Sequence, residues 1–240
     1  MVLPQTNGPR GNRLLAALPD DAYGRLRPHI EVARLPLAKT LVEVGEPIDR
    51  VYFPHDSIVA IVSVMENGAV AEMSTVGREG MTGIGNLWNG DIAVGRQIVQ
   101  MEGTATSIAL PALRNAVRES EPLRSLLSTY TEAFLAQVMQ SQACNSLHSV
   151  QQRACRWLLL AHDRSGRNSF PLTQESLAQM LGVNRTSVTL VARTLQNAGL
   201  IRYRRGSITV TDRPGLEDVS CECYGIIRRH YERLLPQAFN

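Results

Sequence analysis

The chain has 240 residues and lacks the features that mark membrane-spanning proteins and several large enzyme classes. Its longest apolar runs, such as residues 58–62 and 157–161, are far shorter than the roughly 18 residues that span a bilayer. The segment 1–11 has no apolar core, so we expect no secretory signal there. No Walker phosphate loop, dinucleotide-binding fingerprint or nucleophile elbow occurs. We therefore expect no membrane partner and no catalytic residues.

Cysteine is scarce, and its spacing gives neither a disulfide framework nor a familiar metal motif. The four cysteines are Cys144, Cys155, Cys221 and Cys223, and no pair is separated by two residues. Reduced thiols of a cytoplasmic protein are therefore expected rather than secreted disulfides. For the one close pair, at 221 and 223, two thiols near a helix start is the favoured interpretation, with a zinc or redox site as the alternative. We expect no metal and no cofactor.

Lysine is almost absent, since Lys39 is the only one. The other basic residues are arginines, and they are unevenly distributed along the chain. The segment 151–213 holds ten arginines and three acidic residues, a net charge of +7. The remainder holds 15 basic and 19 acidic residues, a net charge of −4. A basic block beside an acidic body is typical of a protein with one part that binds a polyanion. A generic solvated basic face is the alternative.

The N-terminal half changes from helical to strand-like patterning. Short helices are expected within 14–30, where Pro19-Asp20-Asp21 is a helix-start signal. Between about 32 and 110, short apolar stretches alternate with turn residues, and Asn67-Gly68 is a strong hairpin signal. This pattern predicts a small antiparallel β-sandwich or barrel of roughly 80 residues.

A long helix is predicted over about 121–145, because apolar residues recur there every three or four positions. A long helix that links two domains and carries an apolar stripe commonly forms a dimer. An intramolecular core helix is the alternative. The predicted dimer seam comprises Leu127, Tyr130, Phe134 and Val138.

The segment 168–213 carries the clearest motif. Thr173 caps a first helix, the turn 182–184 breaks it, and Asn184 caps a second helix over Arg185–Ala198. Two alternating strands follow and turn at Arg205-Gly206. Two short helices joined by a three-residue turn, followed by a basic hairpin, predict a winged helix-turn-helix.

The second helix has an apolar face and a polar face. The inner face is predicted to comprise Val188, Val191, Leu195 and Ala198. Short polar side chains and arginines near a helix N-terminus can reach base edges in the major groove. Base contacts are therefore expected from Arg185, Thr186, Ser187, Thr189 and Leu190. Phosphate contacts are expected from Gln174, Arg193, Arg204 and Arg205.

The run from Leu172 to Val188, together with Asn197-Ala198-Gly199-Leu200-Ile201, resembles the DNA-binding motif of the Crp/Fnr family of bacterial transcription regulators. The resemblance covers about residues 25–213. It implies an α+β fold with a cyclic-nucleotide-binding-like β jelly roll, a long dimerisation helix and a winged helix-turn-helix. It also implies a cytoplasmic homodimer that binds double-stranded DNA, with RNA polymerase as a candidate partner.

Four parts are predicted on this basis. They are a sensor domain at 12–118, a dimerisation helix at 119–147, a winged helix-turn-helix domain at 148–213 and a helical extension at 214–240.

The sensor domain departs from the cyclic-AMP-binding members that it resembles. In the stretch 80–84, Met81 stands where those members have a glutamate that holds a ribose hydroxyl, and methionine cannot accept that hydrogen bond. Arg96 matches the arginine that binds the phosphate in those members, but Gln97 follows it where they have a serine. On the long helix, Val138-Met139 replaces the polar pair that contacts the purine. Met81, Arg96 and Gln97 remain the candidate effector pocket, for an unknown effector that we expect not to be cyclic AMP.

Two further departures concern iron and the DNA site. The N-terminal cysteine cluster of the iron–sulfur members is missing, which argues against that chemistry. Many members carry an arginine at the position of Leu190 and a glutamate at that of Thr186, so the usual half-site is not expected.

An alternative function from another class is a metal- or small-molecule-binding cupin-like enzyme or module that uses its winged domain for protein contacts. That function needs two clustered histidines and a carboxylate at strand spacing. Of the five histidines, only His55 lies in the strand-rich region. The composition thus favours the DNA-binding interpretation.

Overall fold

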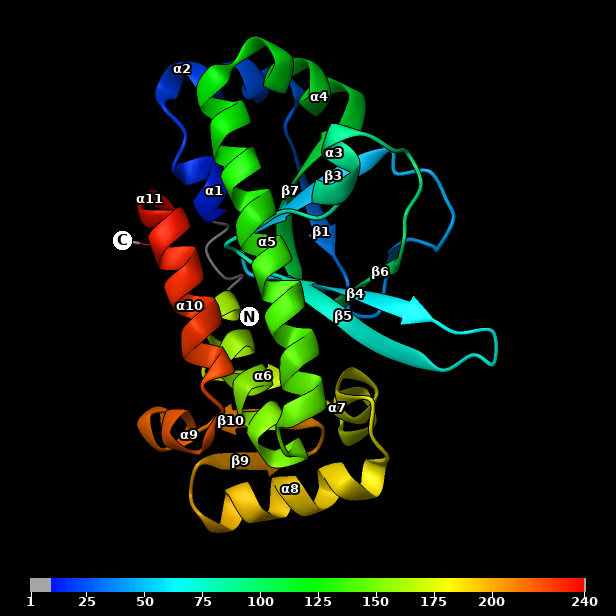
Figure 1. Ribbon diagram of the computed structural model, residues 1–240, viewed down its shortest axis with the longest axis vertical. Coiled ribbons are helices and arrows are strands. Elements are labelled where there is room, and N and C mark those ends of the chain that lie inside the picture. The colour runs from blue at the N-terminus through cyan, green and yellow to red at the C-terminus, as the bar shows by residue number, and fades with distance from the viewer. Residues whose placement is uncertain (1–9, 240) are drawn as a thin grey trace, which may run out of the picture.

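The computed structural model describes residues 10–239, so most of the segment 1–11, where we expect no secretory signal, lies outside the described residues. The long helix α5 (Glu121–Leu147) is the central element (Figure 1). A β-domain lies on one side of it, two C-terminal helices lie on the other, and the remaining C-terminal elements gather at one end.

The β-domain consists of two antiparallel sheets, with strand orders β1-β7-β3 and β2-β6-β4-β5. The strands are β1 (Glu31–Leu35), β2 (Thr40–Val42), β3 (Arg50–Pro54), β4 (Ile58–Val64), β5 (Val70–Val76), β6 (Arg96–Met101) and β7 (Gly103–Ala109). The hairpin predicted at Asn67-Gly68 connects β4 and β5, and Gly68 has a φ of 82°, which favours glycine. The predicted β-sandwich is therefore confirmed.

Short helices flank the sheets of this domain. They are α1 (Arg13–Ala16), α2 (Asp20–Leu26), the 3₁₀ helix η1 (Arg27–His29), α3 (Ile84–Trp88) and α4 (Leu110–Glu119). The side chain of Asn12 caps α1 and also donates to the carbonyls of Pro54 and Gly80, so it fixes the N-terminal helices against the sheets.

The C-terminal half contains the helix α6 (Val150–Ser165) and a second, smaller β-sheet. Its further elements are β8 (Ser169–Pro171), α7 (Gln174–Leu181), α8 (Arg185–Asn197), β9 (Ile201–Arg204), β10 (Ser207–Val210), α9 (Arg213–Val219), α10 (Cys223–Leu234) and α11 (Pro236–Phe239). Helix α10 packs along α5, with the rings of Tyr231 and Tyr130 6.5 Å apart. None of the helices within residues 10–239 combines the length and the hydrophobicity that a membrane-spanning helix needs.

The face of α5 predicted to meet a second copy lies partly inside this chain. Leu127 and Tyr130 are buried in the same core cluster as the β-domain, and the Tyr130 hydroxyl donates to the carbonyl of Met81 at 3.2 Å. Phe134 is half-buried against Tyr130. The predicted seam is therefore wrong for Leu127 and Tyr130, because the β-domain and α10 cover that side of the helix.

The β-domain, α5 and α6 meet at the buried side chain of Arg164. Its Nε donates to Glu79 Oε1 at 2.7 Å and its Nη2 donates to Gln137 Oε1 at 2.7 Å, while Nη1 donates to Thr75. The side chains of Arg164 and Glu79 are only 5% and 7% exposed. The backbone of Gly77 lies so close that a Cβ there would be 2.5 Å from Arg164 Cβ. This cluster fixes α6 against both other parts.

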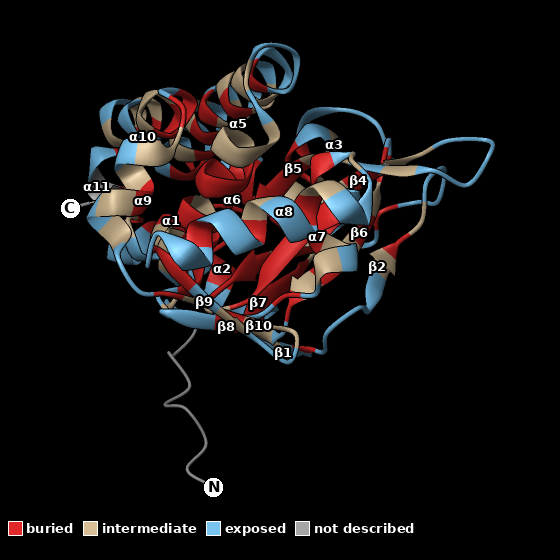
Figure 2. Cartoon of the chain, turned by 90° about the horizontal axis from the view of Figure 1, so that it is seen from below, coloured by how far each residue is buried: buried red, intermediate tan, exposed pale blue. Residues whose placement is uncertain are grey.

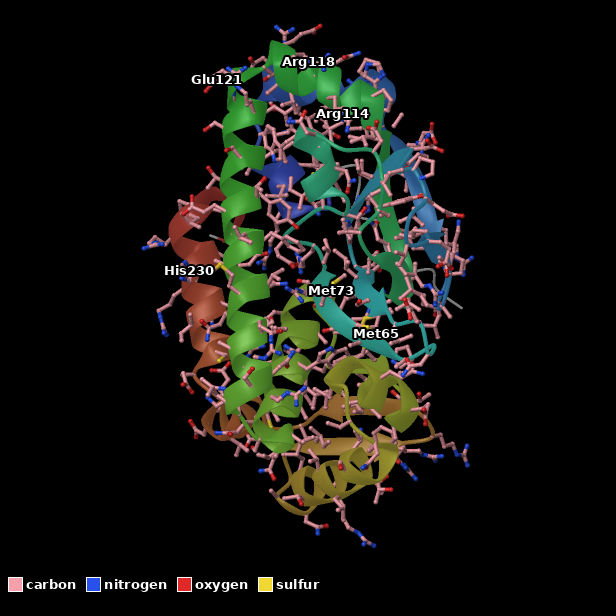
Figure 3. All side chains as sticks on the ribbon, turned by 45° about the vertical axis from the view of Figure 1, so that its right-hand side comes forward. Met65, Met73, Arg114, Arg118, Glu121 and His230 are labelled. Atoms are coloured by element: carbon pink, nitrogen blue, oxygen red, sulfur yellow. The ribbon has the colours of Figure 1, made fainter. Side chains whose placement is uncertain are left out.

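A second contact extends the same interface. Trp157 on α6 donates to Glu72 on β5 at 3.2 Å, and Ile58 and Met101 of the β-domain belong to the core cluster of the C-terminal domain. Figure 3 shows the β4–β5 hairpin, marked by Met65 and Met73, beside the helices of that domain. The two domains are thus docked on one another.

Replacing Arg164 with methionine should destabilise the protein strongly, because Glu79 would remain as a buried carboxylate without its cation. Breaking a buried ion pair in this way costs about 3–5 kcal/mol. Urea unfolding measures the change. The matched control is Arg124→Met, which removes the exposed pair with Glu121 and should cost at most about 1 kcal/mol. Equal losses for the two variants would contradict the assignment.

Candidate nucleic-acid interface

The helices α7 and α8 begin and end where their capping residues predict. Thr173 accepts a hydrogen bond from the amide of Ser176, and Asn184 accepts one from the amide of Ser187 at 2.8 Å. Gly182 ends α7 with a φ of 62°, a left-handed conformation that glycine adopts readily. The chain therefore turns sharply between the helices, and the predicted helix-turn-helix is confirmed.

One face of α8 packs on the domain core. Val188 and Leu195 are buried and Val191 is half-buried, as predicted. The prediction for Ala198 is wrong, because this residue is exposed, and Ala192 is buried instead. Successive residues of an α-helix are rotated by about 100° around its axis, so Ala192 points closer to the direction of Val188 and Leu195 than Ala198 does. In addition, α8 ends at Asn197, before Ala198.

The opposite face of α8 is open to solvent. Figure 2 shows this helix at the end of the molecule, with exposed residues along its outer side. Five of the predicted contact residues are exposed on it: Arg185, Thr186, Thr189, Leu190 and Arg193. Leu190 is 60% exposed, so its apolar side chain is accessible on this face.

Two other predicted contact residues have intramolecular bonds. The Ser187 hydroxyl donates to Asn184 Oδ1 at 2.9 Å, so it contributes to the helix cap. Gln174 Oε1 accepts from the Thr189 hydroxyl at 2.8 Å. This second bond links the first residue of α7 to the outer face of α8 and holds both side chains at the same edge.

The predicted wing is the hairpin of β9 and β10. Its two turn residues, Arg205 and Gly206, have φ values of 48° and 76°, as a two-residue type I′ turn requires. Arg204 and Arg205 are exposed at its tip. The short strand β8 pairs with β10 and makes a three-stranded sheet that the sequence analysis missed, because three residues are too few for a strand periodicity.

Tyr203 fixes the wing relative to α8 and to the segment that leads into α7. Its hydroxyl donates to the carbonyl of Leu172 at 2.9 Å, and its amide donates to Gln196 Oε1 at 2.8 Å. Burial raises the pKa of the Tyr203 phenol, so it remains protonated and can donate at neutral pH. The wing and α8 therefore present one rigid surface.

The ten arginines of the segment 151–213 divide into two groups. Five have bonds or burial inside the molecule: Arg153, Arg156, Arg164, Arg167 and Arg213. Five are exposed on α8 and the wing: Arg185, Arg193, Arg202, Arg204 and Arg205. Among residues 10–239, none of these five pairs with a carboxylate. Only half of these arginines thus form a free cationic surface.

The predicted effector residues lie in different surroundings. Met81 is fully buried in the main core, whereas Arg96 on β6 donates to Glu43 at 2.7 Å. Gln97 is buried beside a shallow hollow that Tyr52 also lines. His55, the histidine of the strand region, is buried with its Nε2 2.9 Å from the hydroxyl of Thr106.

Comparisons with known proteins match this geometry. Residues 152–219 match the family model of the Crp-like helix-turn-helix domain. FixK2 from Bradyrhizobium japonicum superimposes with a TM-score of 0.69 at 14% identity, covering 80% of this chain and 98% of that one. A CRP-family transcriptional regulator from Thermus thermophilus gives 0.66 at 18% identity, covering 78% and 96%. The c-di-GMP-responsive regulator CLP from Xanthomonas campestris gives 0.63 at 15% identity, covering 80% and 99%.

No curated protein matches the sequence. At these identities the structural similarities concern the fold, and the family model covers the C-terminal domain. The resemblance noted in the sequence is confirmed: residues 152–219 form a Crp-like helix-turn-helix domain, and the chain has the fold of the Crp/Fnr transcription regulators.

Proposed function

We propose that this protein is a cytoplasmic, dimeric, sequence-specific DNA-binding transcription regulator, and that it is not an enzyme. The observation that carries the proposal is the surface of α8 and the wing, where five exposed arginines have no carboxylate partner among the described residues. Free cations on a rigid convex surface suit the phosphates of duplex DNA. The family resemblance adds RNA polymerase as a candidate partner.

The proposed docking places the N-terminus of α8 in the major groove. Arg185 is the first residue after the Asn184 cap, where a helix entering the groove meets base edges. We assign base contacts to Arg185, Thr186 and Thr189, and an apolar contact with a thymine methyl group to Leu190. Ser187 would act through its cap rather than directly.

Phosphate contacts are assigned to the periphery of this surface. Arg204 and Arg205 project from the wing tip, and Arg193 lies farther along α8. Gln174 lies at the N-terminus of α7, where free backbone amides favour an anion. These contacts would position the protein without selecting a sequence.

A different face of α5 from the predicted one suits dimer formation. Leu135, Met139, Ala143 and Leu147 follow one another at intervals of four residues, and all are exposed. Leu135 is 57% and Met139 65% exposed. Such an apolar stripe is typical of a helix that packs against a second copy. In that dimer the half-sites would lie about 34–36 Å apart, one duplex turn.

Selection of binding sites from random DNA duplexes tests the proposal directly, with the purified protein in the presence and absence of cell extract. We expect an enriched palindromic site and binding that weakens steeply as salt rises. Recovery of no preferred sequence, together with no salt-dependent binding to duplex DNA, would contradict a DNA-binding function and favour the cupin-like alternative.

Base readout and phosphate anchoring should separate in two variants. Arg185→Ala should relax base preference at one position of each half-site, by about 1–3 kcal/mol, because a bidentate contact with guanine is lost. Arg205→Ala should weaken all sequences alike and lower the salt slope by about one unit. A specificity profile at two salt concentrations measures both. If Arg185→Ala weakened the binding of all sequences alike and Arg205→Ala changed one base preference, the two assignments would have to be exchanged.

The substitution Met139→Glu should produce a monomer with weak DNA binding, because it places a carboxylate in the apolar stripe next to its symmetry mate. Since Met139 is exposed in the single chain, the fold itself should remain intact. Val94→Glu changes an equally apolar residue, 85% exposed on the β-domain, and should remain a dimer. Sedimentation velocity gives the oligomeric state. A dimeric Met139→Glu protein of normal affinity would exclude this face.

Cyclic AMP should neither bind nor tighten DNA binding. Met81 offers no acceptor for a ribose hydroxyl, and Arg96 already pairs with Glu43. Calorimetry and a DNA shift assay at millimolar nucleotide check this expectation. Saturable micromolar binding would overturn it.

A further inference from the structure

Three cysteines and a histidine meet where α5 ends and α10 begins. Cys144 lies in the last turn of α5, His148 follows the end of that helix, and Cys221 and Cys223 lie at the junction of α9 and α10. The ligand-type atoms of all four side chains lie within 4.8 Å of one another. Two chain segments that are distant in sequence thus bring four side chains of metal-ligand type to one point.

We propose that Cys144, His148, Cys221 and Cys223 form a tetrahedral site for a single zinc ion. Three thiolates and one imidazole are a ligand set that structural zinc sites use. The cluster belongs neither to the DNA-binding surface nor to the effector residues discussed above, and its three cysteines are buried.

The distances suit one ion. With zinc–sulfur bonds of about 2.3 Å, two sulfurs on the same tetrahedral ion lie about 3.8 Å apart. Cys144 Sγ and Cys221 Sγ are 3.4 Å apart, and Cys223 Sγ is 3.5 Å from His148 Nδ1. An iron–sulfur cluster inserts several iron atoms between its ligands and would need a wider arrangement. A disulfide would need only two of the four residues and would not use the histidine.

The surroundings orient the ligands as metal sites require. His148 Nε2 lies 3.1 Å from Glu222 Oε2, which leaves Nδ1 directed towards Cys223. A carboxylate that binds the distal nitrogen of a ligating histidine fixes its tautomer and raises its basicity. Gln140 Nε2 lies 3.0 Å from Cys223 Sγ and donates a hydrogen bond to it, as suits a thiolate.

The local charge also favours an occupied site. Three thiolates and one divalent zinc ion carry a net charge of −1, which a nearby cation can balance. Arg156 is buried near Cys144 and has an Nε without a hydrogen-bond partner among the described residues. A buried cation beside an anionic metal centre offsets part of its desolvation cost.

The position of the site defines what the ion would do. His148 and Ser149 form the connection between α5 and α6, so the ion would tie this connection to the start of α10. Zinc would therefore hold the C-terminal extension on α5 and restrict movement of the C-terminal domain relative to that helix.

The first test titrates zinc into the full-length, metal-free, reduced protein and counts bound metal per chain. We expect about one zinc ion per chain, and we expect Co²⁺ to give the visible absorption of tetrahedral thiolate coordination. Cys223→Ser should lose both signals. Cys155→Ser removes a buried cysteine outside the cluster and should retain both.

A second variant distinguishes a loss of zinc affinity from a folding defect. Glu222 is exposed, so Glu222→Gln should fold normally but bind zinc about 10–100-fold more weakly, since it loses the partner of His148. Glu232→Gln, which lies near the other end of α10, should bind zinc as the wild type does. Absence of stoichiometric zinc, unchanged affinity in Cys223→Ser, or iron with acid-labile sulfide in place of zinc would each overturn the proposal.

Discussion

The buried ion pair between Arg164 and Glu79 is the contact on which the arrangement of the domains depends. One guanidinium from α6 donates to a carboxylate of the β-domain, to a hydroxyl of β5 and to the amide oxygen of Gln137 on α5. Burial lowers the pKa of Arg164 but the charge of Glu79 raises it, and the net shift is upward, so the cation is retained. Movement of α6 away from the β-domain would leave a buried charge unpaired, which is costly. Movement away from α5 would break the hydrogen bond with Gln137.

Arginine therefore has two distinct uses in the C-terminal half. Arg164 and Arg213 form ion pairs that hold elements together, while Arg185, Arg204 and Arg205 remain free on the outer surface. A net charge counted along the sequence cannot distinguish these uses. What distinguishes them is whether a carboxylate distant in sequence folds against the guanidinium, as Glu79 does for Arg164 over a separation of 85 residues.

Local signals in the sequence were sufficient for the elements but not for their partners. Caps such as Asn184 and the Arg205-Gly206 turn act over a few residues, so the two helices and the wing could be predicted. The partner of the apolar side of α5 could not be predicted, because an apolar stripe does not indicate whether it packs against the same chain or against a second copy. The Cys144–Cys221 contact spans 77 residues, so no spacing motif could reveal that cluster.

If the exposed arginines bind DNA as proposed, whereas the internal ones maintain the fold, substitutions in the two groups should have different effects. The direct test substitutes Arg193, Arg204 and Arg205, and separately Arg156, Arg164 and Arg213, one at a time by alanine. Each variant is measured for thermal stability and for the salt slope of DNA binding. The account predicts that the first group lowers the slope by about one unit each with little change in stability, and that the second lowers stability with the slope retained. Two groups that behave alike would contradict it.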